Sequence, residues 1–352
     1  MSKKQKSRTR VFVGMSGGVD SSVSAYLLKK QGYDVTGVHL ICWNEGGCSD
    51  AEERDARRVA KALDIPFHVF DLRAEYADRV VDYMVAGYRN GITPNPDVMC
   101  NKEIKFGAFL ERALKMGADL VATGHYARLK EKNGIYSVCT GRDKNKDQSY
   151  FLWALNQEQL GRVIFPVGSL IKSEVRRIAR LAGLHVADKK DSQGICFVGK
   201  VTLRGFLNRY LEEKTGEVLN VDGAVIGHHP GAHFFTIGQR HGLRVALSEP
   251  YYVADKDMEK NTIVLAKEGD PRLYKREVWL EQLNLHPDLR LPSKVWARIR
   301  YRQKLQGARI FQAESGKCGL VFSRPMQFVT PGQSAVFYNF QGKLLGGGTI
   351  SV

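Results

Sequence analysis

Two features of this chain have residue types and spacing suited to chemistry: a loop of glycines and serines, and two isolated cysteines. The loop is SGGVDSS at residues 16–22, directly behind the apolar run VFVGM. Backbone amides at a strand-to-helix turn bind phosphate, and Gly17 and Gly18 allow an anion to approach the main chain. The serine hydroxyls of the loop add further donors. We therefore expect a phosphate group to bind here.

Asp20 lies inside this loop and repels phosphate, so we expect it to orient the loop or to hold Mg²⁺. The loop is not a Walker A motif, because no Lys-Ser/Thr pair follows the glycines. A near match, GICFVGKV at residues 194–201, has Val201 where a metal-binding hydroxyl is required. We discount that second motif.

Cys100 and Cys196 lie in settings that favour a reactive thiol. Cys100 follows a Pro-x-Pro turn and precedes a helix that we expect to begin near Asn101, with Lys102 and Lys105 close in sequence. A helix N-terminus and nearby cations lower the pKa of a thiol. Cys196 lies in the segment QGIC, which is more typical of a mobile loop than of a core strand.

The remaining potential metal ligands and thiols indicate no metal site. None of the six cysteines forms a C-x-x-C pair, which argues against zinc ribbons and thioredoxin-type motifs. The histidines of GHHPGAH have no cysteine nearby, so we do not expect zinc there. We expect Cys42, Cys139 and Cys318 to be small buried side chains, and Cys48 to lie in an exposed loop.

Strands and helices alternate over the first part of the chain, which predicts a parallel sheet with right-handed crossovers. Ligands bind beyond the carboxyl ends of the strands in such sheets. Both the phosphate loop and the Gly124–His125 turn fall there. The expected strands are 10–15, 35–41, 66–70 and 119–123, and the expected helices are 21–30, 50–63 and 104–115.

The periodicity weakens after about residue 200, which divides the chain. We expect an α/β catalytic domain with a doubly wound, Rossmann-like parallel sheet over residues 1–200. A small central domain should follow over 201–271. Short strands separated by Gly and Pro turns predict a C-terminal β-barrel over 272–352.

The net charge of +16 favours a polyanionic partner, with nucleic acid first. Arg298, Arg300 and Arg302 occur at every second position and would share one face of a strand, forming a basic stripe for phosphates. The alternative is a solvated barrel face. No apolar run is long enough to span a membrane, and the run behind the basic start is too short for a signal peptide, so we expect a cytoplasmic protein.

Several motifs together resemble a known family. SGGVDSS resembles the pyrophosphate loop of ATP pyrophosphatases, which have an adenine nucleotide alpha-hydrolase-like fold. TPNPDVMCNKEIKFGAF (93–109), ATGHYAR (122–128), NKDQSYFL (145–152), KDSQGICFVG (190–199) and TPGQSAVFY (330–338) narrow the resemblance to the bacterial tRNA-specific 2-thiouridylases. That family transfers sulfur to C2 of the wobble uridine of tRNA, using ATP to activate the oxygen.

The resemblance implies roles for particular residues. Cys196 would carry a persulfide, Cys100 would be its partner nucleophile, and Asp97 would be an acid/base. ATP would contact Gly14, Met15, Ser16, Gly17, Gly18, Val19, Asp20, Ser21, Leu40 and Gly124. Asn95, Pro96 and Asp97 would line the pocket of the target base, and His125, Lys146, Asp147, Gln148, Tyr301, Arg302 and Gln333 would contact tRNA.

The same resemblance implies ATP and Mg²⁺ as cofactors, and tRNAs with Lys-, Glu- or Gln-type anticodon loops as partners. A sulfur donor, either a relay protein or a cysteine desulfurase, would also be required. Two alternatives stay open: another pyrophosphate-loop enzyme with a different substrate, or a non-catalytic RNA-binding protein that senses ATP. An iron–sulfur cluster on Cys100 and Cys196 is also open. The two cysteines favour the enzyme, because a binding protein has no use for reactive thiols.

Overall fold

The computed structural model describes residues 9–43, 48–190, 202–243, 245 and 249–351. The chain divides into two units, which are described separately. The first contains Met1–Val80, Asp97–Lys200 and Gln341–Leu344, and the second contains Val81–Pro96, Val201–Phe340 and Leu345–Val352.

A five-stranded parallel sheet forms the centre of the first unit, in the order β3-β2-β1-β4-β7. The first four strands fall close to the ranges expected from the sequence. The strands are β1 (Arg10–Gly14), β2 (Asp34–Ile41), β3 (Phe67–Asp71), β4 (Leu120–Ala122) and β7 (Val163–Ile164). The chain leaves β1 towards β2 on one side, and β4 lies on its other side. This reversal of strand order is where α/β sheets bind ligands.

Helices cover both faces of this sheet. Val11 and Val13 of β1 share a core with α2 (Val19–Lys30), α3 (Cys48–Ala62) and α9 (Lys172–Leu181). Residues of the opposite parity face the other side, where a ring carbon of Phe109 lies 3.5 Å from the position of a Cβ on Gly14. The doubly wound fold expected for this region is therefore confirmed.

The helix carrying Phe109 is longer than the sequence suggested. Helical backbone runs without a break through α6 (Pro96–Met99), the π-helical stretch η2 (Cys100–Ala108) and α7 (Phe109–Lys115). A second helical run, α4–η1–α5, extends from Arg73 to Arg89 and was not expected.

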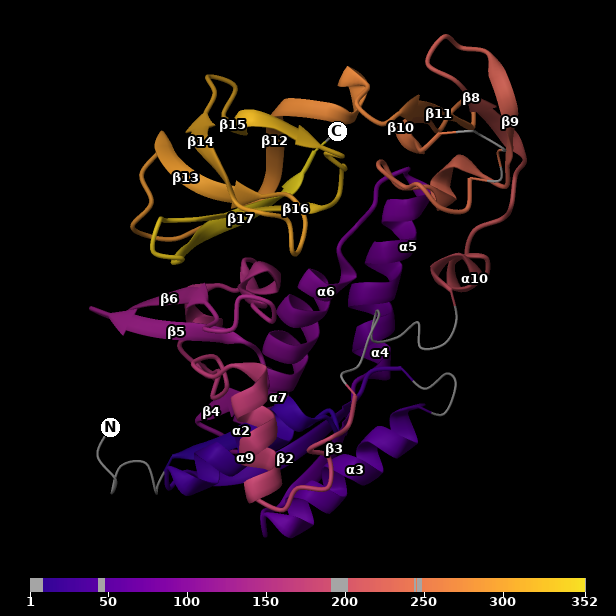
Figure 1. Cartoon of the computed structure of the whole chain (residues 1–352). Helices are drawn as coiled ribbons and strands as arrows, with labels where there is room; N and C mark the ends of the chain where they lie inside the picture. Colours follow the sequence, from indigo (N-terminus) through magenta and orange to yellow (C-terminus); the bar gives the residue numbers. More distant parts are fainter. Residues whose placement is uncertain (1–8, 44–47, 191–201, 244, 246–248, 352) are drawn as a thin grey trace. The chain divides into compact units, whose positions relative to one another are not determined.

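Beyond β4 the first unit continues with the hairpin β5 (Ala127–Lys132) and β6 (Ile135–Thr140), labelled in Figure 1. Two short turns of helix follow, η3 (Ser149–Leu152) and α8 (Gln157–Leu160). A bridge joins Cys139 to Lys343, which is why residues 341–344 belong to this unit.

The second unit contains a small sheet and a closed barrel. The sheet has the order β10-β11-β8-β9, with α10 (Leu203–Leu207) and the turn η4 (Ala232–Phe234) nearby in sequence. Val218, Phe235, Val253, Ile263 and Leu265 form its core. The strands are β8 (Gly216–Leu219), β9 (Val225–His229), β10 (Tyr251–Asp257) and β11 (Thr262–Lys267).

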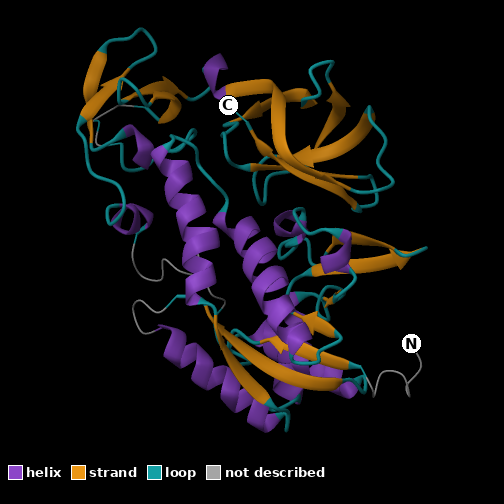
Figure 2. Ribbon diagram, turned by 180° about the vertical axis from the view of Figure 1, so that it is seen from behind, coloured by secondary structure: helices purple, strands orange, loops and turns teal. Residues whose placement is uncertain are grey.

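Six strands close the barrel in the order β12-β15-β14-β13-β16-β17, which confirms the expected C-terminal β-barrel (Figure 2). Strands alternate inward and outward residues, so Val295 and Ala297 enter the barrel core. The strands are β12 (Tyr274–Leu285), β13 (Ser293–Arg298), β14 (Gln306–Gln312), β15 (Cys318–Gln327), β16 (Ser334–Tyr338) and β17 (Leu344–Ile350). A 3-10 turn, η5 (Pro271–Leu273), leads into β12.

The small sheet and the barrel touch through aromatic and polar contacts. The rings of Tyr252 and Phe328 lie 4.8 Å apart, and the Arg300 guanidinium donates to Ile237 O over 2.7 Å. Among the described residues, no helix is both long and apolar enough to cross a bilayer.

Candidate functional site

The glycine–serine loop connects β1 to α2 and can take its shape only with glycine at its second position. Gly17 has φ +70, and a Cβ there would lie 2.3 Å from Glu52 O. Gly18 is the extended N-cap of α2 and caps the helix with no side chain. The first amides of α2 therefore face a position where an anion can accept their hydrogen bonds.

Serine side chains hold the loop from inside. The Ser16 amide donates to Ser21 Oγ over 3.2 Å, and the two hydroxyl oxygens lie 3.3 Å apart. Ser22 Oγ donates to Gly18 O over 2.8 Å. The loop is thus ordered before any ligand arrives, while the exposed Ser16 keeps its hydroxyl at the surface.

The ends of β4 and β2, the strands on either side of β1, flank the phosphate loop. At the end of β4, a Cβ on Gly124 would lie 2.7 Å from Ser21 N, so only glycine allows this close approach. At the end of β2, Leu40 is half-buried, and His39 Nδ1 lies 2.9 Å from Met15 O. Within the described residues, His39 Nε2 is buried and has no hydrogen-bond partner. Leu40 and Gly124 thus lie at the ends of the strands on either side of β1, and contacts of Gly14, Leu40 and Gly124 with ATP stay predictions.

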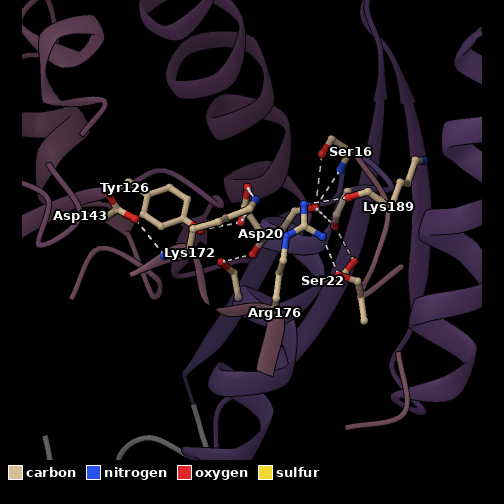
Figure 3. Close-up of polar contacts among 12 residues, drawn as sticks. Ser16, Asp20, Ser22, Tyr126, Asp143, Lys172, Arg176 and Lys189 are labelled. Carbon is tan, nitrogen blue, oxygen red and sulfur yellow. Dashed lines mark hydrogen bonds and ion pairs between the residues drawn. The ribbon is translucent and has the colours of Figure 1, made fainter. Parts of the chain in front are cut away.

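Two lysines at the loop were missed by the sequence analysis. Lys172 Nζ lies 2.7 and 2.8 Å from the two oxygens of Asp20, and Tyr126 donates a third hydrogen bond of 2.7 Å to that carboxylate (Figure 3). Lys189 Nζ donates to Gly17 O over 3.1 Å and to Asp55 over 2.7 Å. Both ammonium groups therefore reach the phosphate loop from far along the chain.

One signal in the sequence could have pointed to Lys172. It is the first residue of α9, where the positive end of the helix dipole disfavours a cation. Its backbone amide donates to Asp143 over 2.9 Å, which fixes the start of the helix. The Lys172 side chain instead pairs with Asp20, which compensates this unfavourable position.

The contacts of Asp20 bear on the two roles expected for it. Both of its oxygens are engaged by Lys172 and Tyr126. This arrangement supports the orienting role, and a contact of Asp20 with Mg²⁺ stays a prediction. Among the described residues, no group of three or more potential metal ligands is present, the histidines of the central segment included.

Cys100 lies one turn inside its helix, so the expectation of a helix beginning near Asn101 is wrong. The helix already begins at Pro96, because proline is favoured at the first helical position. Cys100 is 6% exposed. Asp97 precedes it by three residues, which places the carboxyl and the thiol on the same side of the helix, about 5–6 Å apart at Cβ.

The backbone around Cys100 is π-helical, a geometry that is frequent at functional sites. The Phe109 amide donates to Ile104 O, five residues back. Gln159 supports this stretch by donating to Lys102 O over 3.2 Å and to Phe106 O over 2.8 Å. The Cys100 thiol therefore lies on a helical segment that is stabilised by side-chain hydrogen bonds.

Burial raises the pKa of the Asp97 carboxyl, and the charge of Lys105 acts in the opposite direction. Burial also lowers the pKa of His125 well below its ordinary value, with Lys105 adding to the effect. The neutral His125 ring packs between Phe106 and Phe165, and its Nδ1 lies 2.6 Å from Thr123 Oγ1. The charge of Lys105 thus lowers the pKa of both groups.

The segment expected to contact tRNA after β6 is partly internal. Asp147 is buried and accepts from the amides of Gly141 (2.9 Å) and Ser149 (3.1 Å). The Gln148 side chain accepts from Tyr126 N over 3.0 Å, and Lys146 is half-buried. These bonds shape the loop, and a tRNA contact by these three residues stays a prediction.

In the second unit, Gln333 and the 93–95 segment are brought together. Gln333 Nε2 donates to Thr93 O over 2.9 Å and to Pro94 O over 3.2 Å. Asn95 is buried at 8% exposure, and Pro96 follows it at the end of this unit. The pocket proposed for the target base stays a prediction.

The basic stripe expected on β13 is wrong. The strand ends at Arg298, which is 8% exposed and donates to Tyr338 OH over 3.0 Å. Arg300 bonds to Ile237 O and Thr330 Oγ1. Arg302 lies in a turn with φ +65 and stacks over Tyr301. Alternating residues continue past the end of the strand, so the three guanidinium groups share no face.

The other cysteines differ in burial. Cys139 and Cys318 are buried as expected, whereas Cys42 is half-exposed. Cys196 and the discounted GICFVGKV motif lie outside the described residues, and the side chain of Cys48 does too.

Three family models match consecutive parts of the chain. They are a tRNA methyl transferase HUP domain over residues 9–200, a tRNA methyl transferase PRC-barrel domain over 204–267, and an aminomethyltransferase beta-barrel domain over 274–350. The first model's name refers to methyl transfer, but full-length relatives are named for thiolation. The tRNA-specific 2-thiouridylase MnmA of Alkaliphilus oremlandii is 48% identical, over 99% of both chains.

The chain belongs to the tRNA-specific 2-thiouridylase family. The MnmA protein of Shouchella clausii is 46% identical over 99% of this chain and 98% of its own length. That of Nitrosomonas eutropha is 47% identical over 98% of this chain and 99% of its own. A solved 4-thiouridine synthetase–RNA complex with bound ATP is 20% identical over 57% of this chain and 50% of that one. Its TM-score of 0.35 is too low to carry an argument.

Proposed function

We propose that this thiouridylase-family protein is an ATP-dependent tRNA-uridine 2-sulfurtransferase. One observation carries the proposal: the half-buried Asp97, the buried Cys100 and the phosphate loop belong to the same parallel-sheet unit. A phosphate loop alone fits many ATP-using enzymes. A thiol one helical turn from a half-buried carboxyl adds the chemistry that sulfur transfer requires.

The reaction needs a good leaving group at C2 of uracil. The O2 atom attacks the α-phosphorus of ATP, the α–β phosphoanhydride bond breaks, and pyrophosphate leaves. Asp97 accepts the N3 proton as O2 becomes nucleophilic. The raised pKa of Asp97 suits a proton acceptor that must later release the proton. Adenylate then leaves C2 far more readily than oxide would.

Sulfur arrives on Cys196 as a persulfide. Its terminal sulfur attacks C2 and AMP departs with the former O2. The Cys100 thiolate then attacks the inner sulfur, so the S–S bond to the base breaks and 2-thiouridine is released. The two cysteines are left as a disulfide, which requires a thiol reductant before the next cycle. The persulfide itself comes from a relay protein or a cysteine desulfurase.

The phosphate loop supplies amides for pyrophosphate, and Lys172 and Lys189 supply positive charge at the same place. We propose that ATP carries Mg²⁺ into the site, because both Asp20 oxygens are already bonded to the protein. No step above depends on the ion. The tRNA substrates proposed are those with Lys-, Glu- and Gln-type anticodon loops, where the target base is already unpaired.

The test is mass spectrometry of tRNA nucleosides after incubation with ATP, Mg²⁺ and a persulfide source. The wild-type protein should form 2-thiouridine. Cys100→Ser and Cys196→Ser should release pyrophosphate but form almost none. Cys139→Ser is the control, because this buried thiol lies on β6 and has no part in the reaction. Normal thiolation by Cys100→Ser would refute the role given to that thiol.

A further inference from the structure

Two aromatic side chains on the barrel are exposed next to one another. Trp296 on β13 is 41% exposed, and Phe340, in the turn between β16 and β17, is 86% exposed. Their ring centroids lie 6.4 Å apart with an interplanar angle of 54°. A single exposed apolar residue needs no explanation, but a contacting pair of rings at the surface indicates a binding site.

Trp296 could have a purely structural role instead, in which its ring shields the backbone of a glycine on the neighbouring strand. Gly307 lies opposite Trp296 on β14, and aromatic rings sometimes shield such a glycine. Of the residues that the structure describes, a Cβ built on Gly307 would meet only Ser323 within 4 Å, at 3.6 and 4.0 Å. The indole therefore does not cover Gly307, and the surface beside the ring is open.

A pair of cations lies next to these rings on the same face. Lys294 is two residues before Trp296 on β13, so its side chain leaves the sheet on the same side, roughly 6–7 Å away. Arg309 lies directly opposite Lys294 on β14, and both are exposed. In the part of the chain that the structure describes, neither forms an ion pair. Like charges in directly opposed positions destabilise a sheet, and a bound anion would remove this cost.

We propose that Lys294, Trp296, Arg309 and Phe340, here called the Trp296 face, bind an unpaired stretch of the tRNA. A base stacks on the exposed rings while the two cations contact neighbouring phosphates. The proposal rests on the proposed function, because that function supplies a tRNA with a single-stranded loop. It replaces the arginine stripe expected from the sequence.

The chemistry of the face favours single-stranded RNA over other occupants. Phosphates in a paired stem could use the cations, but stacked bases of a helix offer no free ring to Trp296. An acidic peptide could also pair with the cations, yet it lacks the flat rings that an exposed Trp–Phe pair matches. An unpaired nucleotide has both groups.

The test is filter binding of tRNA across a range of salt concentrations. Stacking contributes about 1–3 kcal/mol per base, so Trp296→Ala should weaken binding by roughly 5- to 150-fold without changing the log–log salt slope. Trp296→Phe should restore most of the affinity. Lys294→Gln with Arg309→Gln should instead lower the slope by about 0.7 per lost contact. Leu181→Ala removes another exposed apolar side chain, 76% exposed on α9, and should have no effect.

A fully paired RNA duplex of the same length separates the two contributions. The defect of Trp296→Ala should disappear with the duplex, whereas that of the charge variant should persist. An unchanged affinity of Trp296→Ala for tRNA would overturn the proposal, as would an equal defect with the duplex. Thiolation by the wild type is measured separately. If the wild type does not thiolate tRNA but Trp296→Ala still weakens tRNA binding, only the proposed function is refuted.

Discussion

Cationic side chains are paired with carboxylates at the phosphate loop but lie next to another cation on the barrel. At the loop, Lys172 and Lys189 each have a carboxylate at 2.7 Å, in Asp20 and Asp55. On the barrel, Lys294 faces Arg309 across two strands. At the loop, these ion pairs order the side chains before a ligand binds, so substitutions there should impair function strongly. On the barrel, the cations are not paired with carboxylates of the described residues, so substitutions there should affect the free protein little and ligand binding more.

The largest effect is expected from Gly17→Ala, which tests how little the loop tolerates. The new Cβ would overlap Glu52 O at 2.3 Å, so the loop must shift and its amides lose their alignment. ATP-dependent pyrophosphate release should fall by about 100-fold or more, while tRNA affinity should stay nearly unchanged.

Gly183→Ala is the matched control for this change. Gly183 also has a positive φ, +65, but no atom of the described part of the chain lies within 4 Å of its Cβ position. This variant carries the backbone cost of about 1 kcal/mol without the clash. Equal loss of activity in the two variants would show that strain alone, rather than close approach at the loop, explains the effect.

A smaller loss is expected from Lys172→Met, which leaves the Asp20 carboxylate uncompensated beside the phosphates. Pyrophosphate release should fall by roughly 10- to 100-fold, with a raised KM for ATP. Asp20→Asn combined with Lys172→Met should cost less than the sum of the single changes, because the two groups interact directly. Strict additivity would contradict the pairing. Lys30→Met, at the far end of α2, should be silent.

Lys256 represents a third situation, a half-buried cation whose one side-chain hydrogen bond among the described residues is to a carbonyl. Its Nζ donates to Phe235 O over 2.7 Å, and burial lowers its pKa from 10.5 to about 8. The unfolded chain therefore binds more protons than the folded one between about pH 8 and 10.5. Stability rises with pH through this window, and the cost is fully present below it.

Lys256→Met removes that cost. Its free energy of unfolding relative to wild type should be highest below pH 8 and should decline by roughly 3 kcal/mol as pH rises to 10.5. Urea denaturation at several pH values measures this. Lys260→Met, whose side chain is 79% exposed, should show no such trend. A relative stability of Lys256→Met that does not vary with pH would contradict a buried, charged lysine.

The smallest effect is expected from Arg309→Gln, which relieves the repulsion from Lys294. The free protein should become more stable by about 0.2–1 kcal/mol at low salt, and high salt should abolish the gain. Lys317→Gln, an exposed charge just before β15, is the control. Destabilisation by Arg309→Gln would show that this arginine has a favourable partner in the free protein.

Local patterns explain which parts of this molecule could be predicted. Alternating and continuous apolar runs identified β1 to β4, and the spacing of glycines and serines identified the phosphate loop. The same reasoning failed at Arg298–Arg302, because alternation in sequence does not reveal where a strand ends. It also misplaced the start of the Cys100 helix, where the preference of proline for the first helical position was overlooked.

The two lysines at the loop could not be predicted from local patterns. Lys172 is 152 residues from Asp20, and Lys189 is 172 residues from Gly17. No periodicity spans such separations. Their proximity follows only from the packing of α9 against α2 in one core.

These separations also affect how the chain matures on the ribosome. The first strand, the loop and α2 are synthesised early, and neighbouring segments can begin to pair during synthesis. The carboxylate of Asp20 gains its ammonium partner only when Lys172 has emerged, and Gly17 O meets Lys189 still later. The backbone of the nucleotide site can therefore form during synthesis before both lysines are available to pair with it. ATP binding by ribosome-bound chains should begin only after about half of the protein has been made.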